Sequence, residues 1–167
     1  MNDLQLQVSA EPLDASSWSP FGWLPVLDTD PRDGESRLFF EWGDVHVNLI
    51  GHSADEVPYT ERGVVCEMFF HHLTHTQAIL VLNCPAVMAV APASCTFEKS
   101  DDLQQVRSFL LRPHDSFVLA RGTWHWGPFP LGEPRVELYN VQGLRYAEDN
   151  ICANLADLGA SIEVLTK

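Results

Sequence analysis

The stretch that decides the fold reads FHHLTHTQ at residues 70–77, and it runs directly into an apolar segment. Its polar centre predicts a tight turn between two strands. Because side chains alternate along a strand, Phe70 and His72 share one face, whereas His71 points to the other. The turn then brings Gln77, at the start of the next strand, back beside His72. We therefore expect Phe70, His72 and Gln77 on one face of the sheet.

Short strands are expected along most of the chain. Alternating or apolar segments bounded by turn residues predict them at residues 4–8, 37–42, 45–50, 64–72, 77–82, 86–91, 106–112, 117–119 and 135–142. The second and third of these are predicted to form a hairpin, with Val45, Val47 and Leu49 on one face. Strands and helices do not alternate along the sequence. The sequence therefore predicts an all-β fold, an antiparallel barrel or a double-sheet jelly roll.

Helices are predicted at two places. Asp14 is placed to cap a short helical turn. Near the C-terminus, apolar residues recur with helical spacing over residues 149–158, and Gly159 is placed to end that helix. We expect this short C-terminal helix to pack outside the barrel.

Length and composition predict one globular domain over residues 1–167. Hydrophobic residues make up 46% of the chain and charged residues 20%. Ten Lys and Arg against 23 Asp and Glu give a formal charge of -13, which repels nucleic acid phosphates and anionic lipids. The N-terminal residues lack the features of a signal peptide, and no apolar run is long enough to span a membrane. We expect a cytoplasmic protein that binds neither nucleic acid nor membranes.

A second segment, ARGTWHWGP at residues 120–128, places His125 between two tryptophans. Such a histidine has either a packed role or an oriented functional one. Arg121 suits a substrate carboxylate, although it can equally form an ordinary salt bridge. Taken alone, His72 also fits a hydrogen-bonded core histidine and Gln77 a polar residue at a strand start. Together, an imidazole and a carboxamide can bind a carboxylate, a urea group or a divalent metal.

The other two histidines of the first segment are weaker candidates. His71 points away from His72 along the strand, and His75 lies in the turn. We expect both on the solvated surface.

The spacing of these residues resembles the two motifs of the cupin superfamily. The first cupin motif has a histidine followed, after four residues, by a glutamate, and here His72 is followed by Gln77. The second motif reads Pro-x-Gly-x-x-His, and here Ala120 takes the place of the proline before Gly122 and His125. Phe70 stands where the first histidine of the motif would be. The resemblance implies a cupin-type β-barrel with its pocket in the barrel mouth.

Within the cupins, the sequence resembles the ureidoglycolate lyase family. Four segments carry the resemblance: residues 19–22, 72–78, 121–125 and 149–152. That family splits ureidoglycolate into glyoxylate and urea at the end of allantoin breakdown, a part of purine catabolism. The chain departs from it where Phe70-His71 replaces a Glu-Arg pair, which removes a carboxylate from the expected pocket.

The resemblance implies a lyase acting on ureidoglycolate or a related small ureido or hydroxy acid. His72 and His125 would divide the general acid and base roles. Arg121 would hold the substrate carboxylate and Gln77 the ureido group. Phe70 and Trp124 complete the expected substrate-binding residues.

The resemblance also implies a divalent metal such as nickel, manganese or zinc. Its ligands would be His72, Gln77 and His125. Two imidazoles and a neutral amide form a poorer cage than three histidines and a carboxylate, so we expect weak occupancy or none. Two alternatives stay open: a cupin that binds a small molecule without catalysis, and another metal-dependent cupin enzyme.

Exposed aromatic residues predict a homodimer. Phe39, Phe40 and Trp42 would leave a flat apolar face wet in a monomer. Closed two-fold pairing is the commonest way to cover such a face.

Overall fold

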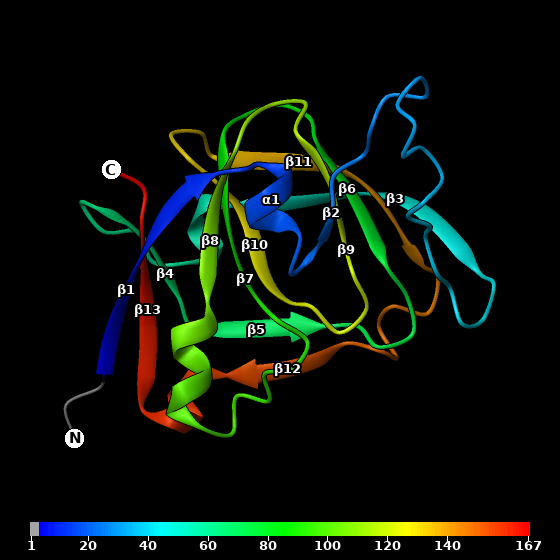
Figure 1. The fold of residues 1–167 in the computed structure, drawn as a ribbon. Coiled ribbons are helices and arrows are strands. Elements are labelled where there is room, and N and C mark those ends of the chain that lie inside the picture. Colours follow the sequence, from blue (N-terminus) through cyan, green and yellow to red (C-terminus); the bar gives the residue numbers. More distant parts are fainter. Residues whose placement is uncertain (1–3) are drawn as a thin grey trace.

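The structure, a computed structural model, describes residues 4–167, and these form two curled β-sheets (Figure 1). The larger sheet contains β1 (Leu4–Pro12), β4 (Gly63–Cys66), β5 (Met68–His71), β7 (Ala86–Ala91), β8 (Arg107–Leu111), β10 (Trp124–Pro130), β12 (Ile151–Asn154) and β13 (Ala160–Leu165). The smaller sheet contains β2 (Gly22–Trp23), β3 (Val45–Ser53), β6 (Gln77–Val81), β9 (Ser116–Leu119) and β11 (Arg135–Gly143).

The strand order is β12-β5-β10-β7-β8-β1-β13-β4 in the larger sheet and β2-β9-β6-β11-β3 in the smaller one. Most neighbours are antiparallel, and β1 pairs in parallel with both β8 and β13. Helical segments are short: α1 (Ala15–Trp18), and the 3-10 turns η1 (Ala54–Glu56), η2 (Ser100–Gln105) and η3 (Leu155–Leu158). The all-β fold class predicted from the sequence is confirmed.

The strand β7 separates two apolar cores, which explains its unbroken apolar sequence. Met88 and Val90 face a core between the two sheets, and Val87 and Ala89 face an outer core enclosed by the curl of the larger sheet. All six residues of the strand are buried. A strand covered on both faces needs apolar residues at every position.

The helix α1 delivers a large side chain to the core between the sheets. The carboxylate of Asp14 accepts hydrogen bonds from the backbone N–H groups of Ser16 and Ser17, which confirms the predicted cap. Trp18 is fully buried, and its indole N–H donates to the carbonyl oxygen of Val118 at 3.0 Å. The cap therefore helps to hold Trp18 in the core between the sheets.

The predicted helix over residues 149–158 is wrong. Residues 151–154 form β12, which lies beside β5 (Figure 1), and only η3 is helical before Gly159 ends the turn with a φ of 61°. Helical spacing of apolar residues does occur here, but β5 offers an open edge. Pairing with that edge satisfies backbone N–H and C=O groups of β5, which a surface helix would leave unpaired.

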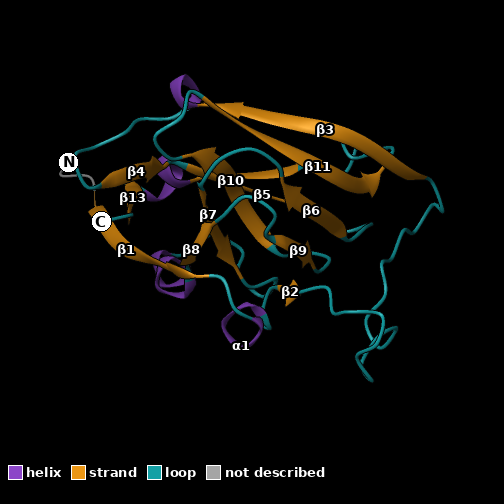
Figure 2. Ribbon diagram, turned by 90° about the horizontal axis from the view of Figure 1, so that it is seen from above, coloured by secondary structure: helices purple, strands orange, loops and turns teal. Residues whose placement is uncertain are grey.

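The predicted strand over residues 37–42 is also wrong. Residues 24–44 form a long loop between β2 and β3 that projects from the body of the molecule (Figure 2). Only an isolated bridge joins Phe40 to His75, supported by hydrogen bonds between Phe39 and Thr76. Val45, Val47 and Leu49 share one face of β3 as predicted, and that face is exposed.

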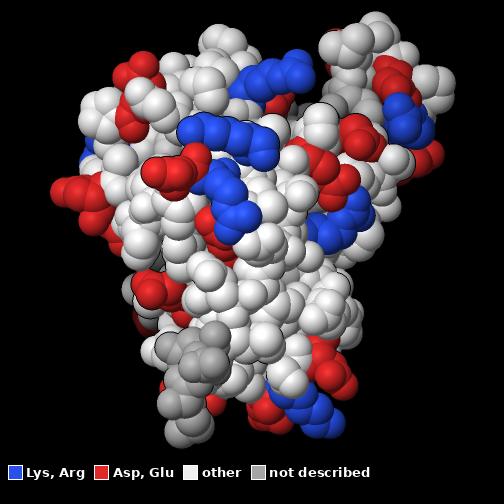
Figure 3. Space-filling model, turned by 90° about the vertical axis from the view of Figure 1, so that its left-hand side faces the viewer, with Lys and Arg blue, Asp and Glu red and all other residues white. Residues whose placement is uncertain are grey.

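The charges of the surface are mixed. On the face shown in Figure 3, Lys and Arg side chains lie beside Asp and Glu and form no continuous basic area. Within residues 4–167, no helix is long and apolar enough to cross a membrane. The cytoplasmic location stays a prediction.

Candidate functional site

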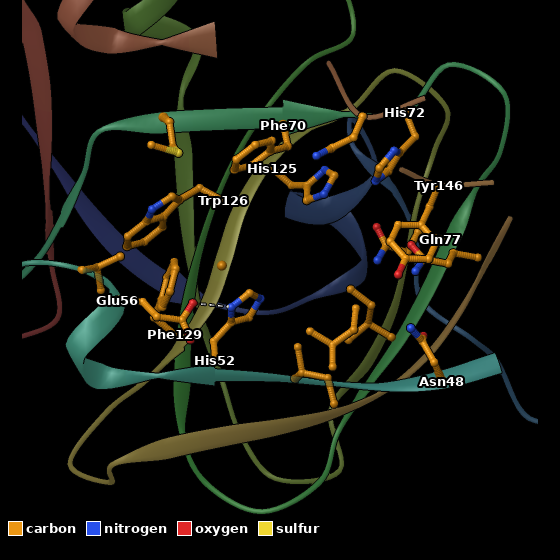
Figure 4. Close-up of a pocket in the computed structure, with 18 of the residues that line it drawn as sticks. Asn48, His52, Glu56, Phe70, His72, Gln77, His125, Trp126, Phe129 and Tyr146 are labelled. Carbon is orange, nitrogen blue, oxygen red and sulfur yellow. Dashed lines mark hydrogen bonds and ion pairs between the residues drawn. The ribbon is translucent and has the colours of Figure 1, made fainter. Parts of the chain in front are cut away.

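A cavity of about 620 Å³ opens between the two sheets (Figure 4). Strands β3, β6 and β11 line one side of it, and strands β5 and β10 line the other. Most of its wall is apolar, with Phe70, Trp126 and Phe129 on the larger sheet and Ile79 and Leu138 on the smaller. Polar side chains are gathered at two places on this wall.

The first polar place holds two imidazoles, His72 just after β5 and His125 on β10. Their ring centroids lie 5.4 Å apart. The Nδ1 of His72 lies 3.2 Å from the carbonyl oxygen of Asp149, and the Nδ1 of His125 lies 3.2 Å from that of Thr123. A carbonyl oxygen can only accept, so in each neutral ring Nδ1 carries the proton and Nε2 keeps its lone pair.

Burial keeps both imidazoles uncharged. It lowers the pKa of His72 to about 4 and the pKa of His125 to about 3, and the neighbouring histidines add to each effect. At neutral pH the pair therefore presents two proton acceptors and no positive charge.

A chain of three amides lies next to the imidazoles. The Nε2 of Gln77 donates to the Oδ1 of Asn140 at 2.8 Å, and the Nδ2 of Asn140 donates to the Oδ1 of Asn48 at 2.7 Å. Gln77 and Asn140 are buried, and the Oε1 of Gln77 has no hydrogen-bond partner. Sequence reasoning missed both asparagines. The signal was available for Asn140, which follows Val136 and Leu138 on the inward phase of one strand.

The second polar place lies across the cavity from His72 (Figure 4). There the Nδ1 of His52 lies 3.1 Å from the Oε2 of Glu56, and the backbone N–H of Ser53 donates to the Oε1 of Glu56. Burial alone would raise the pKa of Glu56, but these hydrogen bonds lower it. Sequence reasoning missed this pair, which the spacing Ser53-x-x-Glu56 of a capping box could have indicated.

The buried carboxylate of Asp149 stabilises the turn that carries His72. Asp149 accepts hydrogen bonds from the backbone N–H and the hydroxyl of Thr74 at 2.8 and 2.6 Å. Burial would raise the pKa of Asp149, and the bonds from Thr74 lower it. His75 lies 3.6 Å from the same carboxylate and stacks on His72 with 4.6 Å between centroids. The turn that carries His72 is therefore held by a charged anchor.

Comparison with models of protein families identifies the family of this chain. The family model of ureidoglycolate lyase matches residues 35–158, about three-quarters of the chain. The chain belongs to the ureidoglycolate lyase family. No curated protein matches the sequence.

Several solved structures are similar over part of the chain. A mutant oxalate decarboxylase from Bacillus subtilis has a TM-score of 0.40 and 17% identity, over 69% of this chain and 25% of that one. The RmlC protein from Streptococcus suis has a TM-score of 0.42 and 12% identity, over 87% and 63%. Peruvianin-I, a cysteine peptidase from Thevetia peruviana latex, has a TM-score of 0.40 and 13% identity, over 60% and 50%. This chain thus spans less than two-thirds of each of the three.

In this ureidoglycolate lyase family member, four of the expected site residues line one cavity: Phe70, His72, Gln77 and His125. Gly122 helps to bring them together, because its backbone N–H donates to the carbonyl oxygen of His72 at 2.7 Å. The two motifs are therefore joined by a hydrogen bond at the turn that precedes β10.

Arg121 and Trp124, which were expected to bind the substrate, do not line this cavity. Arg121 is exposed, with its guanidinium 4.0 Å from the ring centroid of Phe39, because it lies in the turn before β10. Trp124 points to the opposite face of β10 from His125. Its indole N–H donates to the carbonyl oxygen of Cys95 in the outer core.

The predicted exposure of His71 and His75 is also wrong. His71 stacks on Trp124 with 3.6 Å between centroids, and β12 pairs alongside it. His75 is 3% exposed, against Asp149. The segment predicted as a surface helix is the one that covers this side of β5.

The first polar place does not fit a divalent metal. Its donors are two neutral imidazoles and one amide oxygen, and no carboxylate lies among them. Within residues 4–167, no group of three His, Cys, Asp or Glu side chains is arranged to hold a metal ion.

Proposed function

We propose that the chain is a carbon–nitrogen lyase that acts on a small ureido compound. The substrate implied by the family is ureidoglycolate, which would be split into glyoxylate and urea in allantoin and purine catabolism. The observation that supports this most is the convergence of His72, His125 and Gln77 on one cavity from distant parts of the chain.

The two imidazoles suit the proton transfer that this reaction needs. Elimination of urea requires the hydroxyl proton to leave as the carbon–nitrogen bond breaks. The O–H bonding electrons form the carbonyl group of glyoxylate, and the C–N bonding pair leaves with the ureido nitrogen. Because Nε2 is unprotonated in both His72 and His125, the proton given to the departing nitrogen is the one taken from the hydroxyl. One imidazole thus acts first as base and then as acid.

Neutral side chains would hold the rest of the substrate. The Oε1 of Gln77 is free to accept a ureido N–H. Gln142, Tyr146 and Asn150 also line the cavity and can donate hydrogen bonds to substrate oxygens. Arg121 has no part in this arrangement.

The proposal is tested by measuring glyoxylate and urea released from ureidoglycolate by the purified protein. We expect one of the two variants His72→Ala and His125→Ala, the one that removes the base, to lower the rate by about 10²- to 10⁴-fold, and the other to lower it less. His114→Asn is the matched control, since His114 lies outside the cavity lining and Asn tolerates its positive φ of 74°. Absence of glyoxylate release by the unmodified protein would refute the lyase proposal.

A second candidate function is small-molecule binding without catalysis. It is favoured by the aromatic lining of Phe70, Trp126 and Phe129. This alternative predicts that aromatic compounds raise the melting temperature while ureidoglycolate neither does so nor is cleaved.

We also propose that the chain forms a homodimer. The aromatic residues first expected at its interface are partly covered, since the guanidinium of Arg145 lies 4.0 Å from the ring centroid of Trp42. Leu49 on β3 pairs with Tyr139 on β11, and both are exposed, at 68% and 43%. Together with Val45 and Val47 they provide an apolar face for two-fold pairing.

Light scattering tests the dimer. We expect about twice the monomer mass of 18.7 kDa, and Leu49→Glu should return the monomer. Leu27→Glu is the control, because Leu27 is 77% exposed and belongs to the long loop and to neither β3 nor β11. Monomer mass for the unmodified protein at micromolar concentration would exclude the dimer.

A further inference from the structure

We infer that His72 is the base of the lyase reaction, that the carboxylate of Asp149 stabilises its protonated form, and that His125 stays neutral and binds the substrate. The inference rests on the proposed function, in which either imidazole can transfer the proton. It makes His72 a catalytic residue. Asp149 is a positioning residue, because it acts through His72 and does not line the cavity.

The reaction needs one proton carrier. The hydroxyl and the departing nitrogen of ureidoglycolate are bonded to the same carbon atom, so one Nε2 can reach both. The O–H pair becomes the second bond of the glyoxylate carbonyl, and the C–N pair leaves on the ureido nitrogen, which receives the proton from the imidazolium. His72 and His125 lie side by side at one end of the cavity (Figure 4). They differ in what surrounds the positive charge that the base carries.

An anion lies behind His72. Its Nδ1–H donates to the backbone carbonyl of Asp149 at 3.2 Å, and the side chain of the same residue is a buried carboxylate. Burial alone would raise the pKa of that carboxyl, but hydrogen bonds from Thr74 at 2.8 and 2.6 Å lower it. Burial and the neighbouring His75 lower the pKa of His72, and the charge of Asp149 raises it. A positive charge formed on His72 is thus matched by a negative charge that is held in place.

The surroundings of His125 oppose a positive charge. Its Nδ1–H donates to the backbone carbonyl of Thr123, whose side chain is a neutral hydroxyl bonded to the carbonyl of Phe21. Burial lowers the pKa of His125 to about 3, and the neighbouring His72 lowers it further. His125 is therefore the weaker base of the two.

His125 is well placed to hold the substrate. It lies on β10, which pairs with β5 on one side and with β7 on the other, whereas His72 lies beyond the end of β5. The Nε2 of His125 and the free Oε1 of Gln77 can accept ureido N–H groups. The amide and phenol donors of the lining are then left for the substrate carboxylate.

Steady-state kinetics of the full chain test the two imidazoles. We expect His72→Ala to lower kcat by about 100-fold or more, and added imidazole to restore about a tenth of the lost rate. His125→Ala should lower kcat by less than about tenfold and raise KM by about fivefold, without rescue by imidazole. If His72→Ala does not fold, His72→Gln takes its place. A larger loss of kcat in His125→Ala, or rescue of that variant alone, would overturn the inference.

A double-mutant cycle tests Asp149. Asp149→Asn keeps the backbone carbonyl and an acceptor for Thr74 but removes the charge, so kcat should fall by about tenfold while KM stays within about twofold. Added to His72→Ala, the same substitution should barely change the residual rate, and added to His125→Ala it should keep its full effect. Asp157→Asn, at an exposed position, is the control. Equal effects of Asp149→Asn in both backgrounds would overturn the inference.

NMR of the imidazoles separates this inference from the lyase proposal, because it needs no turnover. As the pH is lowered, His72 should take up a proton before His125, and Asp149→Asn should lower the pKa of His72 and leave that of His125 unchanged. If glyoxylate is released but the order of protonation is reversed, only this inference fails. If no glyoxylate is released, the lyase proposal fails, and the NMR result still decides which imidazole the proton prefers.

Discussion

The two ends of the space between the sheets share strands β6 and β11 and are filled differently. At the packed end, Trp18, Phe21, Phe109 and Phe117 are at most 1% exposed and meet edge to face, with centroids 5.0 to 6.0 Å apart. At the open end, imidazoles and amides lie on the cavity wall among apolar residues. The change occurs within single strands. On β6, for example, inward positions pass from Gln77 to apolar residues.

This difference shows how a barrel accommodates a polar cavity beside an apolar core. Most polar groups of the open end are held by another polar group: Gln77 by Asn140, His72 by the Asp149 carbonyl, and Thr74 by the Asp149 carboxylate. The packed end has few such constraints and is stabilised by contact area. The two ends should therefore fail in different ways when they are changed.

The largest effect on stability is expected at the packed end. Trp18→Ala should lower the free energy of unfolding by about 3–5 kcal/mol, because it leaves a cavity and an unpaired Val118 carbonyl. Urea denaturation measures this. Trp42→Ala is the control, since Trp42 is 39% exposed, and should cost less than about 1 kcal/mol. Similar losses for both tryptophans would contradict the distinction between core and surface.

The open end should instead respond to pH. The unfolded imidazoles of His72 and His125 have an ordinary pKa of 6.5, and burial lowers the folded values to about 4 and about 3. Between these values the unfolded chain binds more protons, so stability is full above pH 6.5 and falls as the pH falls. From pH 7.5 to pH 5 we expect a loss of about 2 kcal/mol for each imidazole.

Denaturation curves at these pH values test the prediction. Replacing either histidine by Gln should reduce the pH dependence. Part of it should remain, because burial also lowers the pKa of His71 and of His75. An unchanged slope in both variants would mean that other groups cause it.

The anchor of the turn should have a smaller effect. Asp149→Ala removes the acceptor for the backbone N–H and hydroxyl of Thr74, and we expect the free energy of unfolding to fall by about 2 kcal/mol. Because the carbonyl of residue 149 also orients His72, the rate of ureidoglycolate cleavage should fall too. Asp157→Ala, at an exposed position, is the control. Equal losses of stability and of rate in the two variants would show that Asp149 does not anchor the turn.

The smallest effect is expected at Arg121. Its guanidinium rests on Phe39 at the surface, so Arg121→Ala should change the free energy of unfolding by less than about 1 kcal/mol. The KM for ureidoglycolate should also stay within about twofold, because Arg121 lies outside the cavity lining. A tenfold rise in KM would show instead that Arg121 binds the substrate and supplies a positive charge at the open end.

Part of the candidate site could be predicted before any fold was known. Alternation along one strand puts Phe70 and His72 on the same face, and a tight turn returns the chain so that Gln77 lies in the same cavity. The cap at Asp14 and the continuous apolar run of β7 were readable for the same reason. Each depends on residues that are close in sequence, where backbone geometry alone fixes which side chains share a face.

The sequence by itself therefore determined the β class, the family and the histidine–glutamine pair, and tertiary structure decided the rest. Whether residues 151–154 became a helix or β12 depended on the open edge of β5, which arrives from a distant part of the chain. The partners of Asn140, the burial of His75 and the exclusion of Arg121 likewise depended on which strands met when the sheets closed. The spacing of residues along the chain does not predict such contacts, because all strand edges and sheet faces compete for partners at once.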